Sequence, residues 1–363
     1  MSATFVEARP ADANWVGWVK RELRPTRLRE VRTAILVVGV VLCVIISMTL
    51  QVPELALSAY MVFFISKENK ALTTITGVGG LIGVTIGVAA TLLLYKFTYG
   101  HPELRVPAMA IALFLGMYLS RAFVIGALGF IIGFVVSYSQ SIAEQLPSPE
   151  LLVRASLWLW VAVAYGVGLT VVLNRLFLPT PAEAQSHRPK SKSLFVPDAF
   201  TNPAHVQFAL KVTFAAMFCY LFYSGIDWTG IHTAFITCIF IALETTEATL
   251  YKATLRIVGC VIGGALSLFS IVFLVPHMET IASLIVLVAA VSAIAGWVAT
   301  GSERISYAGL QIAFAFFLSM FQGYAPDTDL DKIRDRVVGI LIGIAVTTVF
   351  FHYLWPERSR MKS

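Results

Sequence analysis

The chain has 363 residues, of which 58% are hydrophobic and only 13% are charged, and its formal net charge at pH 7 is +6. Soluble globular domains have about a quarter of their residues charged, so this composition excludes a soluble enzyme and predicts a protein that faces lipid. Long, uniformly apolar runs such as residues 34–50 and 81–94 also exclude a β-barrel, whose strands alternate polar and apolar residues.

The positive charge does not indicate nucleic-acid binding, because that requires a basic patch on a folded soluble surface. The four cysteines stand alone in apolar runs, without the spacing of a disulfide framework or a metal site: Cys43, Cys219, Cys238 and Cys260. No GxxxxGK[ST] phosphate-binding loop is present. We therefore expect no metal, no cofactor and no enzymatic activity, and any active transport would draw on an ion gradient or on a partner.

About twenty apolar residues span a bilayer as a helix. In chain order, the first candidate spans are residues 32–51, 54–66, 72–95, 104–120, 122–140 and 155–177. After a polar break, the next are residues 205–223, 230–245, 252–275, 279–299, 304–321 and 333–355. The sequence thus predicts an all-α polytopic membrane protein with about twelve transmembrane helices.

The basic residues predict how these spans are oriented. Of the 27 Lys and Arg residues, 20 fall on the side that would hold both termini, 6 fall on the far side, and Lys211 falls inside a span. Because basic residues concentrate on the cytoplasmic side of a membrane, we expect both termini to be cytoplasmic.

Several segments recur at a nearly constant offset. Residues 83–87 resemble residues 259–263, 176 positions later, and residues 166–179 resemble residues 343–356, 177 positions later. With six spans in each half, the two halves would insert in the same direction as parallel repeats, an arrangement that commonly encloses a central pathway. The expected organisation is a cytoplasmic N-terminal segment, a first six-helix repeat, a cytoplasmic linker rich in Pro, Ser and basic residues, a second repeat and a cytoplasmic tail: 1–31, 32–178, 179–204, 205–356 and 357–363.

Glycines four residues apart recur in the spans. The pairs are Gly83/Gly87, Gly129/Gly133, Gly259/Gly263 and Gly339/Gly343. Glycine lets helix backbones approach closely in membranes, so these pairs predict helix packing.

Three basic residues are candidates for a substrate pathway. Lys211 lies about two turns into the seventh span, where its ammonium would either reach the headgroup region or attract an anion. Arg121 and Arg304 stand at the turn between the fourth and fifth spans of their halves. They would either anchor the cytoplasmic side or bind a substrate carboxylate through the guanidinium fork.

Acidic residues stand at the cytoplasmic ends of the second and eighth spans. Glu244 and Glu247 are three positions apart and would share a helix face, and Glu68 takes the equivalent place in the first half. These carboxylates would be either a solvated loop paired with nearby bases or a gate that exchanges protons, since partial burial brings carboxylates toward titration at neutral pH.

Polar residues also enter the eighth span from the far side. Asp227 precedes His232 and Thr233, and Thr237 follows one turn later. The histidine would either shuttle protons or make an ordinary hydrogen bond, and we include the two threonines with the pathway and Asp227 with the proton-sensitive groups.

Five stretches of the chain have a familiar pattern: Arg21–Pro25, Thr49–Pro53, Tyr60–Asn69, Gly230–Thr237 and Lys252–Arg256. Through them the chain resembles the fusaric acid resistance (FUSC) family of bacterial inner-membrane efflux proteins, also called aromatic acid exporters. The resemblance covers both membrane halves, about 30–356. Family members often have large cytoplasmic regions between and after the halves, whereas the linker here has about 26 residues.

The resemblance implies export of aromatic or other weak organic acids and drugs from the bacterial inner membrane, driven by protons in antiport. It also implies a periplasmic membrane-fusion adapter and an outer-membrane channel as partners, and by analogy a homodimer. The alternative is a passive organic-anion channel built from the same halves.

Overall fold

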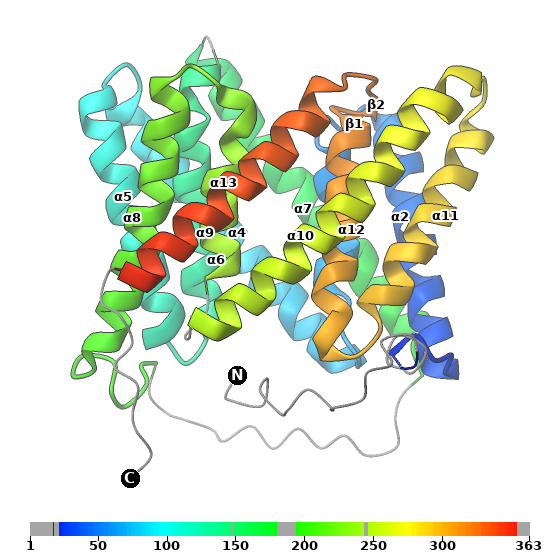
Figure 1. The fold of residues 1–363 in the computed structure, drawn as a ribbon, viewed down its shortest axis with the longest axis horizontal. Coiled ribbons are helices and arrows are strands. Elements are labelled where there is room, and N and C mark those ends of the chain that lie inside the picture. Colours follow the sequence, from blue (N-terminus) through cyan, green and yellow to red (C-terminus); the bar gives the residue numbers. More distant parts are fainter. Residues whose placement is uncertain (1–16, 18–21, 147, 180–193, 243–245, 354–363) are drawn as a thin grey trace. The chain divides into compact units, whose positions relative to one another are not determined.

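The computed structural model describes residues 17, 22–146, 148–179, 194–242 and 246–353. Within these residues the α-helices of the first half of the chain are α2 (Arg27–Leu50), α3 (Leu55–Ile65), α4 (Lys70–Thr98), α5 (Pro102–Ala122), α6 (Gly126–Ser141) and α7 (Pro149–Phe177). Those of the second half are α8 (Pro203–Gly225), α9 (Thr233–Ile241), α10 (Thr246–Phe269), α11 (Ile281–Ala299), α12 (Glu303–Met320) and α13 (Asp331–Tyr353). Figure 1 colours them in chain order from blue to red.

The remaining elements are short. They are the 3-10 helices η1 (Ala143–Gln145), η2 (Thr229–His232) and η4 (Val275–His277), the π-helix η3 (Ser270–Leu274), and the strands β1 (Phe321–Gln322) and β2 (Ala325–Pro326). The two strands form an antiparallel hairpin in which Phe321 pairs with Pro326.

The helices form two compact units, and each takes helices from both halves of the chain. Unit 1 contains α2, α3 and the end of α7 from the first half, with most of α10, α11, α12 and the hairpin from the second. Unit 2 contains most of α4 and α7, with α5 and α6, from the first half, and α8, α9 and α13 from the second.

A short, almost completely buried helix lies at the centre of each unit. In unit 1, α3 packs against α2 and α12, and α2 also packs against α11. In unit 2, α9 packs against α8 and α13, and α8 also packs against α5. Both central helices are apolar on every side, as expected for helices that contact protein all around.

The GxxxG pairs lie at helix contacts, so the packing predicted for them is confirmed. A Cβ at Gly87 on α4 would lie 2.9 Å from Val135 on α6. A Cβ at Gly263 on α10 would lie 2.5 Å from the backbone oxygen of Ile312 on α12, and one at Gly343 on α13 would lie 2.6 Å from that of Ala234 on α9. These helices could not approach so closely with any larger residue at the contact.

The described end of the linker contacts the turn between α5 and α6. Val124 N donates to Leu194 O at 3.0 Å, and Val196 N donates to Ala122 O at 2.9 Å. The rings of Phe123 and Phe195 meet edge to face at 4.8 Å. Residues 194–202 therefore belong to unit 2, although their composition predicts a linker.

Eight helices in the described residues are long and apolar enough to cross a membrane: α2, α4, α5, α7, α8, α10 with its extension to His277, α11 and α13. Three further apolar helices are shorter, namely α3, α6 and η2 with α9. Along α4 a row of large apolar side chains is exposed (Ile75, Val78, Ile82, Ile86 and Leu93), which suits contact with lipid. The chain therefore has an all-α, multi-pass membrane fold, as predicted, and the count of twelve spans remains a prediction.

Candidate functional site

A buried basic and aromatic cluster lies inside unit 1. We call it the Arg256 cluster, and its members are Tyr60 on α3, Lys252 and Arg256 on α10, and Tyr307, Gln311 and Phe314 on α12. The Arg256 side chain is only 1% exposed. Because a buried charge is costly unless it is paired, its surroundings decide what the cluster can do.

One nitrogen of Arg256 makes both of its side-chain hydrogen bonds within the described residues. Its Nη1 donates to Gln311 Oε1 at 2.9 Å and to Tyr307 Oη at 3.4 Å. Nε and Nη2 are buried and have no hydrogen-bond partner among the described residues. No ion pair between Arg256 and a carboxylate occurs within that part of the chain either.

Aromatic rings surround the two cations of the cluster. The guanidinium carbon of Arg256 lies 5.9 Å from the Phe314 ring centroid, and Lys252 Nζ lies 5.0 Å from that of Tyr307. Tyr60 meets Phe314 edge to face, with centroids 4.7 Å apart. Cation–π contacts of this kind offset part of the cost of removing a cation from water.

Helix spacing and one close helix contact build this arrangement. Lys252 and Arg256 are four residues apart on α10, and Tyr307 and Gln311 are four apart on α12, so each pair shares a helix face. A Cβ at Gly259 would lie 2.5 Å from the backbone oxygen of Ala308 and 2.6 Å from Gln311 Cβ. The glycine thus brings α10 close enough to α12 for the amide of Gln311 to reach the guanidinium of Arg256.

Tyr60 connects the cluster to the loop that follows α3. Its ring stacks on Phe64 at 6.0 Å, and Lys67 Nζ lies 5.4 Å from the Phe64 ring and donates to Phe64 O at 2.8 Å. Lys67, Phe64 and Tyr60 therefore form a continuous series of contacts from the α3–α4 loop to the ring of Phe314.

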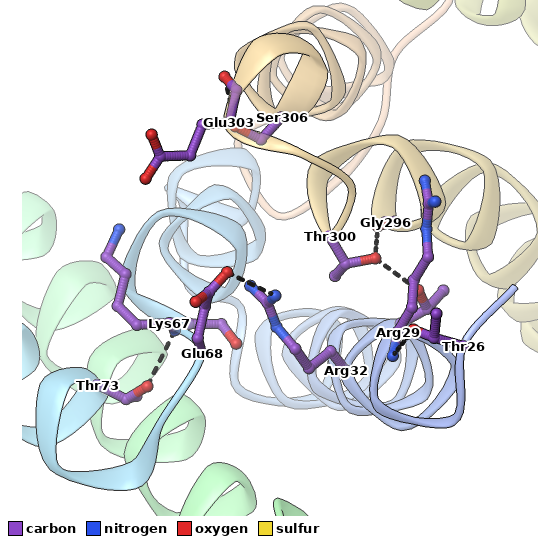
Figure 2. A network of polar contacts seen from close by, with 12 residues as sticks. Thr26, Arg29, Arg32, Lys67, Glu68, Thr73, Gly296, Thr300, Glu303 and Ser306 are labelled. Atoms are coloured by element: carbon purple, nitrogen blue, oxygen red, sulfur yellow. Dashed lines mark hydrogen bonds and ion pairs between the residues drawn. The ribbon is translucent and has the colours of Figure 1, made fainter. Parts of the chain in front are cut away.

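Glu68 lies in the same loop and faces Arg32 of α2, as Figure 2 shows. Its Oε1 is 3.5 Å from Arg32 Nη1, and the glutamate side chain is 75% exposed whereas that of Arg32 is 12% exposed. Burial, and after it the nearby Arg32 cation, lowers the pKa of Lys67 below its ordinary value. Ion pairs with an exposed partner are weak, so Glu68 can exchange partners at little cost.

Two of the predicted basic residues lie in unit 2 over aromatic rings. Lys211 on α8 is 7% exposed, with Nζ 5.4 Å from the Phe351 ring of α13. Arg121 is in the last turn of α5, with its guanidinium carbon 5.0 Å from the Phe208 ring of α8. Arg304, by contrast, belongs to unit 1, where it is exposed in the first turn of α12 and its carbonyl accepts from Tyr251 Oη at 2.9 Å.

The polar residues around the start of α9 are held by backbone carbonyls. His232 Nδ1 lies 3.1 Å from Thr229 O, Thr237 Oγ1 donates to Thr233 O at 2.7 Å, and Thr233 Oγ1 donates to Arg336 O at 3.3 Å. The two threonines are buried on the side of α9 that meets α13. The contact of Thr233 with Arg336 joins α9 to α13, whereas those of His232 and Thr237 are made to residues three and four positions earlier in the chain.

The remaining acidic candidates are dispersed. Asp227 is exposed in the turn after α8 with a φ of 54°, a left-handed conformation that aspartate tolerates better than most residues. Glu244 lies outside the described residues, and Glu247 is placed in α10 but its side chain is not among those described. No metal-binding group of His, Cys, Asp or Glu occurs in the part of the chain that the structure describes.

The Arg256 cluster was not identified from the sequence, because Lys252 and Arg256 stand at the beginning of an apolar run and resemble interfacial anchors. A usable signal was present in the eleventh span, where Tyr307 and Gln311 put polar groups on one face of an apolar helix. Polar residues inside a span usually meet a partner, and here the partner is the arginine.

These features define a multi-pass α-helical membrane protein with buried cations. Residues 212–350 match the model of the family described as fusaric acid resistance protein-like. The chain is also 24% identical, over 482 aligned positions, to the multidrug resistance protein MdtO of Escherichia coli K12, of E. coli O157:H7 and of Shigella flexneri. Each alignment covers 93% of this chain and 70% of the relative.

The resemblance to the fusaric acid resistance family is thereby confirmed, and the match to the family model lies in the second half of the chain. The alignments with MdtO are longer than this chain, so these relatives have segments that lack a counterpart here. No solved structure matches the chain.

Proposed function

We propose that this chain is a bacterial inner-membrane efflux transporter that exports aromatic or other weak organic acids. The family match and the similarity to a multidrug resistance protein support the class. The observation that carries the substrate chemistry is the Arg256 cluster, in which two cations lie among aromatic rings without a carboxylate partner in the described residues. Such surroundings suit an organic anion, and the protein would act as a carrier rather than as an enzyme.

The proposal includes twelve spans arranged as two parallel repeats, with both termini in the cytoplasm. Gln51 and Asp227 are 176 positions apart and follow α2 and α8, and they have φ values of 53° and 54°. They are the two non-glycine residues with positive φ in the described part of the chain. The pairing of α2 with α11 is matched, at the repeat offset, by the pairing of α8 with α5. The excess of Lys and Arg on one side supports the orientation.

Proton antiport is the proposed source of energy. Glu244, Glu247, Glu68 and Asp227 would be the proton-sensitive groups, and Lys211, Arg121, Arg304, His232, Thr233 and Thr237 would line further parts of the pathway. A periplasmic membrane-fusion adapter and an outer-membrane channel would receive the substrate, and the transporter would work as a homodimer. These partners are supported by family resemblance alone.

A passive organic-anion channel is the second candidate, because an unpaired buried cation attracts an anion whether or not protons move with it. Uphill transport separates the two. The test uses purified protein in liposomes with an imposed pH gradient and follows uptake of a labelled aromatic acid with and without a protonophore. Protein-free liposomes correct for leakage of the neutral acid.

The matched variant for this experiment is Glu244→Gln/Glu247→Gln. We expect the wild type to accumulate the acid against its gradient, and the variant and the protonophore each to abolish this accumulation. Protein-dependent flux that only equilibrates the anion and follows the membrane potential would favour the channel. Flux no greater than in protein-free liposomes would refute transport of this acid by the chain alone.

A further inference from the structure

Arg256 uses only one side of its guanidinium. Tyr307 and Gln311 both accept from Nη1, while Nε and Nη2 remain without a partner among the described residues. Nε and Nη2 present two parallel N–H groups on one edge of the guanidinium plane, which is the edge that a carboxylate binds with both oxygens. The residues around Arg256 thus hold the guanidinium in place and leave its bidentate donor pair, Nε and Nη2, available to a ligand.

The two cations of the cluster are like charges, which favours the binding of an anion. Lys252 and Arg256 are like charges four residues apart on α10, a spacing that destabilises a helix. Both cations contact the same tyrosine, since Lys252 lies over the ring of Tyr307 and Arg256 bonds to its hydroxyl. Among the described residues neither cation forms an ion pair. A bound carboxylate would supply the missing negative charge.

The positions equivalent by the repeat carry no charge. At the repeat offset, Tyr307 and Gln311 correspond to Phe130 and Phe134 on α6, and Arg256 corresponds to Gly80 on α4. Phe130 and Phe134 stack on each other and meet Phe240 edge to face in an apolar ladder. At these two positions α6 packs through aromatic rings without a charged or amide group, so the arginine, the tyrosine and the glutamine of unit 1 call for a separate explanation.

We propose that the Nε/Nη2 edge of Arg256 is the binding site for the carboxylate of the transported acid, one site per chain, with Gln311 and Tyr307 as positioning residues. The rings of Phe314 and Tyr60 make the surroundings suitable for the aromatic part of an arylcarboxylate. Because Arg256 is 1% exposed, the ligand reaches it when helices of unit 1 move, as alternating access requires. The inference rests on the proposed function, from which it takes the class of ligand.

The test measures equilibrium binding of radiolabelled benzoate to the full chain in lipid nanodiscs, separately from transport. We expect the wild type to bind one benzoate per chain and not to bind benzamide, which has the same shape but no charge. Arg256→Gln should abolish binding. Arg256→Lys keeps the charge but lacks the fork, and should weaken binding by about tenfold or more. Arg105→Gln, which removes a buried cation of unit 2 outside the proposed pathway, should bind as the wild type does.

Thermal stability shows whether a variant fails to bind only because it fails to fold. Benzoate should raise the melting temperature of the wild type, because a ligand of the folded state stabilises it, and should leave that of Arg256→Gln unchanged. Without benzoate, Arg256→Gln should melt at or above the wild-type temperature, because the variant no longer buries an unpaired cation.

Several results would overturn the inference. They are equal binding by the wild type and Arg256→Lys, loss of binding in Arg105→Gln, and no binding by the wild type. Binding that appears only in Glu244→Gln/Glu247→Gln would also overturn it, because a carboxylate of the chain itself would then occupy the fork. If benzoate binding depends on Arg256 but the wild type shows no uphill transport, the proposed function is refuted and the binding site is supported. If Arg256→Gln still transports the acid uphill, the binding site is refuted and the proposed function is supported.

Discussion

Arg29 joins the segment before α2 to the end of α11. Its Nε donates to Trp297 O at 2.9 Å, its Nη1 donates to Glu22 O at 2.7 Å, and Nη2 also donates to Trp297 O. The guanidinium carbon lies 4.7 Å from the Trp297 ring, whose Nε1 donates to Leu23 O at 3.1 Å. One arginine thus satisfies backbone carbonyls from two distant parts of unit 1.

Lysine cannot replace this arginine, because an ammonium lacks the planar fork that reaches several carbonyls at once. Hydrogen bonds from a charged donor contribute about 1.5–3 kcal/mol each, so we expect Arg29→Lys to lose about 1–3 kcal/mol of stability and to melt at a lower temperature in detergent. Arg27→Lys, on the exposed side of the same helix, is the matched control and should melt as the wild type does. Equal melting of both variants would show that the contacts of Arg29 do not stabilise the fold.

Lys67 makes the stability of unit 1 depend on pH. Its pKa is lowered from the ordinary 10.5 by burial and by Arg32, so between its folded pKa and 10.5 the unfolded chain holds more protons than the folded chain. In that window the free energy of unfolding rises with pH. We expect the melting temperature to climb as the pH approaches 10.5 from below and the climb to be smaller in Lys67→Gln. A wild-type profile that is flat in this window, or a climb that is unchanged in Lys67→Gln, would contradict the assignment.

At the scale of single elements, helix positions follow closely from the sequence because apolar length alone sets them. The segment expected at 54–66 is the helix Leu55–Ile65, and the one expected at 104–120 is Pro102–Ala122. The β1–β2 hairpin was not predicted, since its position depends on Gly323 O accepting from Leu55 N at 3.2 Å, a contact between residues distant in sequence. The Arg256 cluster escaped prediction for the same reason, because α3, α10 and α12 meet only in the folded chain.

The contact between α5 and α6 allows a direct test of the glycine pairs. A Cβ at Gly133 would lie 2.5 Å from Gly116 Cα and 3.1 Å from Ala112 O, both backbone atoms that cannot rotate away. Gly133→Ala should therefore separate the two helices and destabilise the protein by about 3 kcal/mol, the upper part of the range for overpacking.

Gly79→Ala is the matched control for that substitution, because a Cβ at Gly79 on α4 would meet nothing within 4 Å. It should leave stability unchanged or raise it slightly, since alanine is the better helix former. Thermal denaturation of both variants in the same detergent makes the comparison, and a Gly133→Ala protein as stable as the control would show that α5 and α6 tolerate a wider spacing.

At the scale of the whole chain, each unit is built by exchange between the halves. The first two described helices, α2 and α3, pack with α11 and α12 of the other half, and α8 packs with α5. Neither half therefore completes a unit alone, and a site assembled in unit 1 necessarily combines residues from both. This explains why Tyr60 from the first half and Arg256 from the second contribute to one cluster, and why the sequence pattern of a single repeat could not show it.

Thr33 and Thr300 offer a direct test of this exchange, because their hydroxyl oxygens lie 3.1 Å apart between α2 and the end of α11. Cysteines at this distance have their Cβ atoms within reach of a disulfide. In a background without the four native cysteines and with a protease site inserted in the linker, Thr33→Cys/Thr300→Cys should keep the two fragments covalently joined after oxidation and cleavage. Thr33→Cys alone should release them, as should the double variant after reduction. Fragments that separate under oxidising conditions would mean that α2 and α11 do not meet, which would contradict the exchange of helices between the halves in unit 1.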